Sequence, residues 1–338
     1  MTNTTVSIEK KRSGRIFRKV LVGLLVVVAV YVGACLFLGP VVYREFYGLT
    51  QFGAAFPDRG DGFVPQGVTK TESGETLICG YMNGKGASRL YVYTPDGKET
   101  RIDLETKDGA PYTGHAGGIT AAGAYVYISN AHKLFVLKAA DVLNAPDGAT
   151  LAFVGHVDVP VNASYCSSSD SMLYVGEFHD DGYETDQAHK IETASGTYQA
   201  MTFGYKLDPT GEFGLLQPAA PTVAYATPDS AQGFAVLPDG RVAVSCSHGF
   251  RDSHLYLYDG TGEPDGTFMC GDDGLTVPMV ILDETRLTRD LKMPHMSEDL
   301  DWRDGRLMMG FEAGALKFGA GLLPLSVRRV ALLDLSTR

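Results

Sequence analysis

The chain has 338 residues, 40 of them glycine, and a formal net charge of −11 at pH 7. Residues 44–338 alone hold 23 Lys and Arg residues against 39 Asp and Glu residues, a formal charge of −16. A surface of that sign repels nucleic acid, so the composition excludes nucleic acid as a partner. The length suits one large all-β domain or two smaller ones.

The first 42 residues indicate a cytoplasmic tail followed by a membrane span. Six basic residues lie between positions 10 and 19, and an uncharged apolar run follows from Val20 to Gly39. As a helix, such a run spans about 30 Å, the thickness of the hydrocarbon core. Because basic flanks stay inside, we expect a basic tail at 1–19, a retained single-pass anchor at 20–42, and the remainder outside the cytoplasmic membrane. A cleaved signal peptide is the alternative.

An internal repeat predicts the architecture of the remainder. Residues 66–93 and 232–258 share one order: a Gln-Gly-apolar strand, a turn, and two further strands. Three more copies open with other residues, at His115-Ala116-Gly117-Gly118, Asn162-Ala163-Ser164 and Met296-Ser297-Glu298. Repeats of about four short strands separated by Pro-Asp-Gly turns are typical of a β-propeller. The sequence therefore predicts an all-β propeller domain at 63–338 with five blades, or six if an insertion hides another sheet.

The outer strands and the connections are less regular than the inner ones. The last copy lacks a strand, and the connector at 43–62 supplies it from about 45–56, which closes the ring and protects an edge. We expect outer strands at 151–157 in the second blade and at 277–282 in the fourth. The third blade carries a polar insertion at about 180–198.

Four cysteines lie in the expected propeller, at positions Cys79, Cys166, Cys246 and Cys270. An oxidising exterior permits disulfides, and four cysteines allow three connectivities. Cys79 and Cys246 fall inside expected strands, where small buried thiols are common. Two possibilities remain open for these cysteines: free thiols in the core, or one disulfide bridge.

The repeat also predicts where a site lies. The innermost strands of a propeller begin at one face of the central channel, so residues at matching positions converge there. These positions hold Gln66, His115 (two residues before Gly117), Ser164, Gln232 and Glu298. Converging polar groups at one mouth are the default place for a ligand. The ends of the second strands add further candidates, which include Glu177, His248 and Glu312.

Three of these residues are acidic, and acidic clusters carry chemistry. Glu177, Glu298 and Glu312, if partly buried together, would have raised pKa values. Two such carboxyl groups could act as general acid and base on a glycoside. The catalytic candidates are therefore Glu298 and Glu177, with His115 as a further acid/base group.

The blade pattern resembles the gluconolactonase and paraoxonase-like calcium propellers and, more loosely, the NHL-type propellers. The likeness rests on an inner strand of the form x-x-Gly-apolar, then Pro-Asp-Gly and a Val/Tyr-rich second strand, over about 64–335. The resemblance implies a Ca²⁺ ion held by Glu, Asn and Asp on the inner strands. Gln66 and Gln232 at the matching positions are amides, weaker calcium ligands, which leaves Glu298 as the one candidate metal ligand. The segment Phe311-Glu312-Ala313-Gly314-Ala315 is also similar to uncharacterised bacterial exported propellers.

These observations favour a membrane-anchored, extracytoplasmic propeller that binds a small molecule, glycan or peptide at the channel mouth. Its expected lining residues are Gln66, His115, Gln232, Glu298 and Glu312. One alternative is a calcium-dependent lactonase, an esterase-like enzyme or a glycosidase-type hydrolase. Another is a protein-interaction scaffold that uses the insertion at 180–198.

Overall fold

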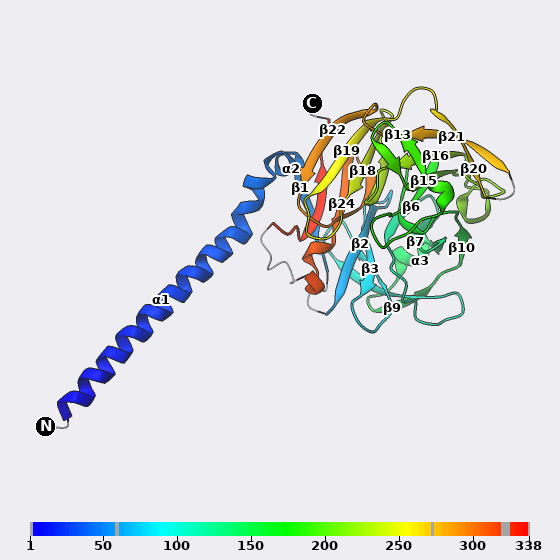
Figure 1. The fold of residues 1–338 in the computed structure, drawn as a ribbon. Coiled ribbons are helices and arrows are strands. Elements are labelled where there is room, and N and C mark those ends of the chain that lie inside the picture. The colour runs from blue at the N-terminus through cyan, green and yellow to red at the C-terminus, as the bar shows by residue number, and fades with distance from the viewer. Residues whose placement is uncertain (1–2, 58–60, 272–273, 319–324, 337–338) are drawn as a thin grey trace.

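The structure is a computed structural model that describes residues 3–57, 61–271, 274–318 and 325–336; side chains are described from residue 17 onward, except at 35–36. A 40-residue helix, α1 (Asn3–Val42), leads into a five-bladed β-propeller (Figure 1). Residues 58–60 of the expected connector lie outside the described residues.

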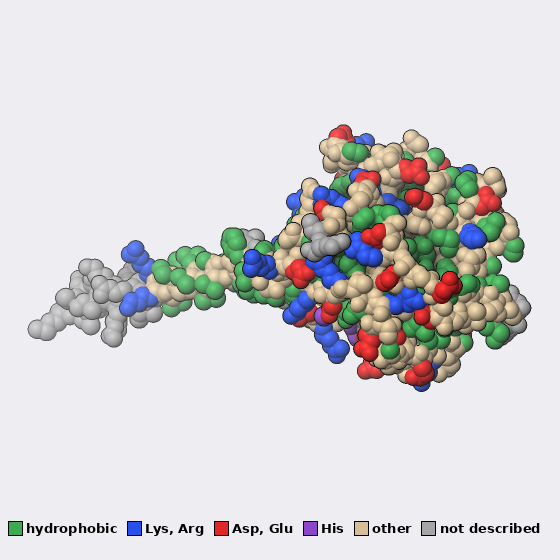
Figure 2. Space-filling view, turned by 90° about the horizontal axis from the view of Figure 1, so that it is seen from above, with side chains coloured by type: hydrophobic (Ala, Val, Ile, Leu, Met, Phe, Trp, Pro, Cys, Tyr) green, Lys and Arg blue, Asp and Glu red, His purple; other side chains and the backbone are tan. Residues whose placement is uncertain are grey.

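Within the described part of the chain, one helix is long and apolar enough to cross a membrane, through its segment Phe17–Ala34. None of that segment is buried against the propeller. Hydrophobic side chains cover the helix, whereas the propeller surface mixes acidic, basic and apolar groups (Figure 2). A signal anchor and a signal sequence both fit this helix.

Five antiparallel arrangements of four strands form the ring, which confirms the predicted blade number. The first blade contains β2 (Phe63–Lys70), β3 (Thr76–Met82), β4 (Arg89–Tyr93) and β5 (Glu99–Glu105). The second contains β6 (Gly118–Ala122), β7 (Tyr125–Asn130), β8 (Lys133–Lys138) and β10 (Gly155–Asp158). The third contains β11 (Ala163–Ser168), β12 (Met172–Glu177), β15 (Ala200–Lys206) and β16 (Val223–Thr227). The fourth contains β17 (Ala231–Val236), β18 (Arg241–Cys246), β19 (Ser253–Asp259) and β22 (Leu287–Met293).

The fifth blade is completed by a strand from the other end of the domain. Its own strands are β23 (Ser297–Arg303), β24 (Arg306–Phe311) and β25 (Arg329–Leu333). The strand β1 (Thr50–Ala55) pairs antiparallel with β25, with Thr50 opposite Leu333. The short helix α2 (Arg44–Leu49) precedes β1 and buries Phe46 completely. The segment at 45–56 thus supplies the missing outer strand, as the sequence predicted.

The outer strand expected at 151–157 is correct only for residues 155–157, because this segment belongs to two strands in two blades. After the helix α3 (Ala139–Asn144), β9 (Ala149–Ala152) pairs parallel with β5 and extends the first blade. Only β10 pairs with β8 of the second blade. Both halves of 151–157 contain apolar residues, and their composition does not say which neighbour each half joins.

The outer strand expected at 277–282 is also wrong. The strand β21 (Leu275–Ile281) forms a hairpin with β20 (Gly266–Cys270) and pairs parallel with β16, so it extends the third blade. The outer strand of the fourth blade is β22, which pairs with β19. Four of the seven β22 residues are polar, which makes its sequence signal weaker than that of β21.

The polar insertion of the third blade folds as a small hairpin of its own. It contains the 3-10 helix η1 (Gln187–His189) and the strands β13 (Ile191–Thr193) and β14 (Gly196–Tyr198). Two hydrogen bonds tie its tip to the loop before β22: Asp283 Oδ2 accepts from the Ala194 N–H at 2.9 Å, and Ser195 Oγ accepts from the Glu284 N–H at 2.9 Å. A further 3-10 helix, η2 (Glu212–Gly214), lies between β15 and β16.

The inner strands approach one another so closely that glycine is required beside the site. A Cβ on Gly67 would lie 2.5 Å from the Ile119 nitrogen, and one on Gly233 would lie 2.7 Å from the Leu300 nitrogen. The Gly of the repeated Gln-Gly sequence is therefore a packing residue, and the Gln before it is left to face the channel. Cys79, Cys166 and Cys246 are buried free thiols, and Cys270 is also buried.

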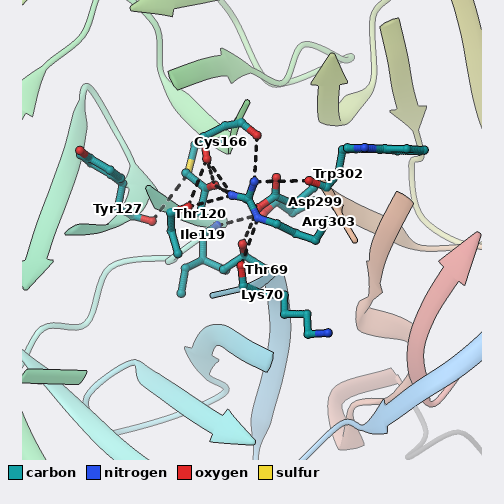
Figure 3. A network of polar contacts seen from close by, with 12 residues as sticks. Thr69, Lys70, Ile119, Thr120, Tyr127, Cys166, Asp299, Trp302 and Arg303 are labelled. Atoms are coloured by element: carbon teal, nitrogen blue, oxygen red, sulfur yellow. Dashed lines mark hydrogen bonds and ion pairs between the residues drawn. The ribbon is translucent and has the colours of Figure 1, made fainter. Parts of the chain in front are cut away.

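The strand β23 closes the axis of the ring. It contacts the inner strands β2, β6, β11 and β17 of the other four blades. Its Arg303 pairs with Asp301 at 2.9 Å and donates to Thr120 Oγ1 and Ser168 Oγ of two other blades, at 2.9 and 2.7 Å (Figure 3). Asp299 Oδ2 accepts from the Ile119 N–H at 2.9 Å. Buried polar side chains thus fill the channel beneath its mouth.

Candidate binding site at the channel mouth

A cavity of about 380 Å³ lies at the end of the channel where the inner strands begin. Two rings of side chains line it, one from each strand position that the sequence singled out. The first ring, at the inner-strand starts, consists of Gln66, His115, Ser164, Gln232 and Glu298. The second ring, at or just after the ends of the second strands, consists of Tyr81, Asn130, Phe178, His248 and Glu312. The structure therefore brings together all five residues expected to line a site.

β-Bulges aim the first ring into the cavity. The pairing of inner and second strand shifts register between Pro65 and Val68, between Ala163 and Tyr165, between Ala231 and Gly233, and between Ser297 and Leu300. Each interval contains the site residue of its blade. A bulge leaves a residue outside the hydrogen-bonded ladder and redirects its side chain, which is a common device beside functional sites. In the second blade, Ala116 at φ +51° makes a comparable break next to His115.

A hydrogen-bonded chain joins three of the lining residues. Gln66 Nε2 donates to Glu312 Oε2 at 3.0 Å, and Gln66 Oε1 lies 2.7 Å from His115 Nε2. Because the amide oxygen only accepts, His115 Nε2 carries a proton, and Nδ1 of the neutral ring is an acceptor. The amide of Gln66 therefore orients both the imidazole and the carboxyl group.

The imidazole of His115 is held against Tyr81. The two rings are stacked with centroids 4.5 Å apart. The backbone N–H of His115 donates to Asn130 Oδ1 at 2.9 Å. His115 keeps contact with solvent through the cavity, but protein surrounds its ring on the other sides. Desolvation, assisted by the Lys317 ammonium, lowers the pKa of His115 to about 4. The ring is therefore neutral at pH 7.

Two carboxyl groups share the floor of the cavity. Desolvation raises the pKa of Glu298 well above its usual range, and the charges of Glu312 and Asp299 raise it further. Desolvation also raises the pKa of Glu312, but there the Lys317 ammonium and the Gln66 amide oppose the shift. Both carboxyl groups therefore favour the protonated form, and the hydrogen bond from Gln66 favours the ionised form of Glu312.

Lys317 provides the cation at the rim. It belongs to the 3-10 helix η4 (Leu316–Phe318), which follows η3 (Glu312–Gly314) in the connection after β24. Its Nζ donates to the Tyr81 hydroxyl at 2.7 Å and lies 5.2 Å from the centroid of the Tyr81 ring. Desolvation, with the charges of Glu312 and Glu298, raises the pKa of Tyr81, so its hydroxyl stays protonated.

Aromatic side chains form the opposite wall. Phe178 contacts the ring of Tyr183 edge-on at 5.3 Å and that of His248 at 5.8 Å between centroids. His248 Nδ1 lies 2.9 Å from Asp180 Oδ2, which holds the imidazole in place. The cavity is thus polar and hydrogen-bonding on one side and aromatic on the other.

Glu177 does not reach the cavity, although the sequence grouped it with Glu298 and Glu312. Its carboxyl group is buried behind the third blade, where Oε1 lies 2.5 Å from His189 Nδ1. The same carboxyl group accepts from the Met201 and Asn162 N–H groups, both at 3.3 Å. Glu177 therefore fastens the insertion to its blade. Phe178, the next residue, points to the cavity because side chains alternate along a strand.

Sequence reasoning missed five polar lining residues: Tyr81, Asn130, Asn162, Tyr183 and Lys317. Tyr81 and Asn130 end the second strands of their blades, so the rule that found Glu312 would have found them if applied to every blade. Asn162 immediately precedes the third inner strand. Tyr183 and Lys317 lie in insertions that have no counterpart in the repeat, and no sequence signal marks them.

The lining residues do not fit the calcium ion of the resembled family. Among the residues that the structure describes, no three Asp, Glu, His or Cys side chains are placed to hold a metal ion. Calcium takes six to eight oxygen ligands. Here Glu298 favours its protonated form, the Gln66 oxygen faces His115, and the Lys317 ammonium lies nearby. Glu298 is therefore a cavity residue without a metal-ligand set around it.

Comparisons with known proteins assign no family to the chain. No protein-family model and no curated protein matches the chain. Among solved structures, the PQQ-bound aldose sugar dehydrogenase of Streptomyces coelicolor is 12% identical, with a TM-score of 0.38 over 77% of this chain and 76% of that one. A virginiamycin B lyase of Staphylococcus aureus is 12% identical (TM-score 0.37, covering 85% and 99%), and a chain of the nidogen/laminin complex is 9% identical (TM-score 0.35, covering 74% and 73%). Likenesses this distant assign no activity to this chain.

Proposed function

We propose that this propeller binds a small, uncharged polar molecule with several hydroxyl groups, such as a glycan unit, at the channel mouth. The observation that carries the proposal is the convergence of side chains from all five blades on one cavity of about 380 Å³. That volume falls in the range of about 300–1,000 Å³ typical of small-molecule sites.

The charges of the cavity favour an uncharged ligand. His115 is neutral at pH 7, because its pKa is lowered to about 4, and the raised pKa of Glu298 favours its neutral acid. The remaining carboxyl group, Glu312, lies near the Lys317 ammonium, which opposes the rise of its pKa that burial causes. A site with little net charge but many donors and acceptors suits hydroxyl groups, which both donate and accept.

The aromatic wall supplies the apolar part of the recognition. Phe178 and Tyr183 present ring faces and edges opposite the polar floor. Aromatic side chains gain free energy by burying the C–H surface of a ligand, while the polar groups fix its orientation.

The membrane attachment belongs to the same proposal. We place the α1 helix in the cytoplasmic membrane as a retained anchor, with the propeller outside. The basic residues at 10–19 support this orientation, because basic flanks stay on the cytoplasmic side.

Substituting Gln232 by Ala tests the binding proposal. Among the described residues, the Gln232 side chain makes no hydrogen bond, so its removal leaves the network of Gln66, His115 and Glu312 intact. We expect the affinity for the best ligand from a panel of neutral mono- and disaccharides to fall about tenfold, or ~1.4 kcal/mol. Titration calorimetry on the full-length protein in detergent measures the change.

The matched control is Gln51→Ala, because Gln51 is an exposed glutamine on β1 that does not line the cavity. Its affinity should stay within about twofold of the wild type. Equal losses in both variants, or no binding of any neutral polar ligand, would contradict the proposal.

A hydrolase is the second candidate, and one observation favours it. Glu298 and Glu312 are neighbouring carboxyl groups whose surroundings push their pKa values apart, as in enzymes that use one carboxyl group as acid and the other as base. The roles would be general acid for Glu298 and base or nucleophile for Glu312, with the Nδ1 of His115 as a further acceptor.

Glu298→Gln separates the hydrolase from the binding protein. The amide has the shape of the protonated acid but cannot release a proton, so a hydrolase should lose at least about a hundredfold in turnover while its affinity and melting temperature change little. Chromogenic glycosides and lactones serve as substrates. Turnover that persists in this variant would rule out Glu298 as the acid, and absent turnover in the wild type would leave the binding function.

A further inference from the structure

We propose that the rim of the cavity rests on the bilayer that α1 spans, so that the channel mouth opens at the membrane surface. This inference rests on α1 being a span and is independent of the ligand proposed above. The rim consists of Tyr183, Phe250, Leu316, Lys317 and Phe318.

The apolar surface of α1 continues up to the propeller. Beyond the segment Phe17–Ala34, the side chains of Phe37, Leu38, Val41 and Val42 are also exposed. From Val20 to Val42 the helix is about 34 Å long, close to the hydrocarbon thickness of about 30 Å. An apolar core that starts after the basic Lys19 therefore ends within a turn of Tyr43, the first buried residue of the propeller.

The base of α1 is fastened to the propeller. Tyr43 and Phe46 are 3% and 0% exposed, and the Tyr43 hydroxyl donates to Asp252 Oδ1 at 2.5 Å. The ring of Phe46 meets that of Phe311 edge-on at 5.9 Å between centroids. A helix base buried in this way cannot act as a loose tether, so the propeller face around it is held beside the bilayer.

The residues that hold the base are next to residues of the cavity. Asp252 lies two positions after Phe250 and three after Gly249, which lines the cavity, and Phe311 directly precedes Glu312. In Figure 1, α1 and the short orange-red helices η3 and η4 lie on the same flank of the propeller. The membrane helix therefore emerges beside the cavity mouth.

The rim is apolar where the bilayer would meet it. Phe250, Tyr183 and Leu316 are 63%, 58% and 50% exposed, and Phe250 contacts the ring of Phe318 at 6.4 Å between centroids. Exposed apolar groups gathered at one place mark an interaction surface. The bilayer is the occupant that fits, because this patch lies on the flank of the propeller from which the exposed apolar surface of α1 emerges (Figure 1).

Local charge is compatible with a lipid surface despite the acidic composition of the domain. Arg44 and Arg251 are exposed beside the base of α1, and Lys317 is exposed at the rim. Basic residues near the headgroups favour membrane contact, and aromatic side chains such as Tyr183 and Phe250 suit the interface. A ligand held at the bilayer surface would then reach the cavity directly.

Tryptophan reporters test this contact in the full-length chain. Trp302, the one tryptophan of the sequence, is replaced by Phe, and Phe250→Trp or Met269→Trp is then introduced. Met269 is 64% exposed, nearly the same as Phe250, but lies on the β20–β21 hairpin at the outer edge of the third blade. Both proteins are reconstituted in phosphatidylcholine nanodiscs, with and without a brominated phosphatidylcholine that quenches tryptophan. Leu316→Trp serves as a second rim reporter if the first variant fails to fold.

We expect the rim reporters to lose about half of their emission in the brominated discs, because an interfacial contact brings the ring to about 5–10 Å depth. The Met269→Trp protein should keep its emission. Equal emission with and without bromine at both rim positions would overturn the inference and leave the patch to a protein partner. Equal quenching at the rim and at Met269→Trp, or failure of the chain to stay in the discs, would overturn it as well.

Discussion

Glu298, Asp299 and Asp301 belong to one stretch of four residues in β23. All three carboxyl groups are buried on the axis of the ring. Desolvation is the largest cause of the raised pKa of each. They differ in their partners: Asp301 pairs with Arg303, Asp299 accepts from the Ile119 N–H, and Glu298 faces the cavity. Asp301 and Asp299 thus belong to the closure of the channel, and Glu298 belongs to the site.

Asp299→Asn should change how stability depends on pH. The pKa of Asp299 in the folded protein is raised well above its value in the unfolded chain, about 3.9. Its contribution to stability is therefore complete below that unfolded value and is lost as the pH rises through the folded pKa. Asparagine does not titrate. The melting temperature of the variant should therefore rise relative to that of the wild type as the pH increases from about 4 to 8.

The measurement is a set of thermal melts across that pH range. Asp158→Asn is the control, because the Asp158 side chain is 80% exposed and should leave the pH profile unchanged. Parallel profiles for Asp299→Asn and the wild type would show that the Asp299 carboxyl group does not titrate differently in the folded and unfolded states.

At the scale of elements, α2 and β1 show how a short segment secures both the ring and the base of α1. β1 pairs with β25 and so covers the edge that the last blade would otherwise expose. α2 places Phe46 in the core cluster that also contains Phe311 and Leu333. The same thirteen residues, 43–55, therefore join α1, the closing blade and, through Phe311, the segment that carries Glu312.

Phe46→Ala should destabilise the protein by about 3–5 kcal/mol, because it removes a completely buried ring and leaves a cavity. Denaturant unfolding of the full-length protein in detergent measures the change. Phe17→Ala is the matched control, since Phe17 is 69% exposed on α1 and its loss should leave the unfolding midpoint unchanged. A loss below about 1 kcal/mol for Phe46→Ala would mean that α2 is not part of the cooperative core.

At the scale of the whole molecule, the ring combines one polar mouth with one attached helix. Five inner strands start around the cavity, and one of them, β23, also fills the axis of the ring behind it. The hydrogen-bonded chain from His115 through Gln66 to Glu312 connects blades two, one and five across the mouth. Such a network exists only in the closed ring, because its members are 49 and 246 residues apart in the chain.

Much of the site was predictable because the propeller repeats. Once Gln66 and Gln232 were aligned, the other three inner-strand starts followed, and Glu312 followed from the ends of the second strands. Glu177 was misplaced because one position along a strand decides between the two faces of a blade, and the repeat does not fix the face. Tyr183 and Lys317 were not predictable, because each enters from a segment outside the repeat.

The sequence by itself determined the apolar N-terminal helix, the five blades and the positions of the inner ring. These features depend on local patterns: a run of apolar residues, strands of period two, and Pro-Asp-Gly turns. Only the tertiary structure decided that β9 and β21 join neighbouring blades, that Glu177 pairs with His189, and that Lys317 lies beside Tyr81. Those outcomes depend on contacts between distant residues, whose free energies no local pattern contains.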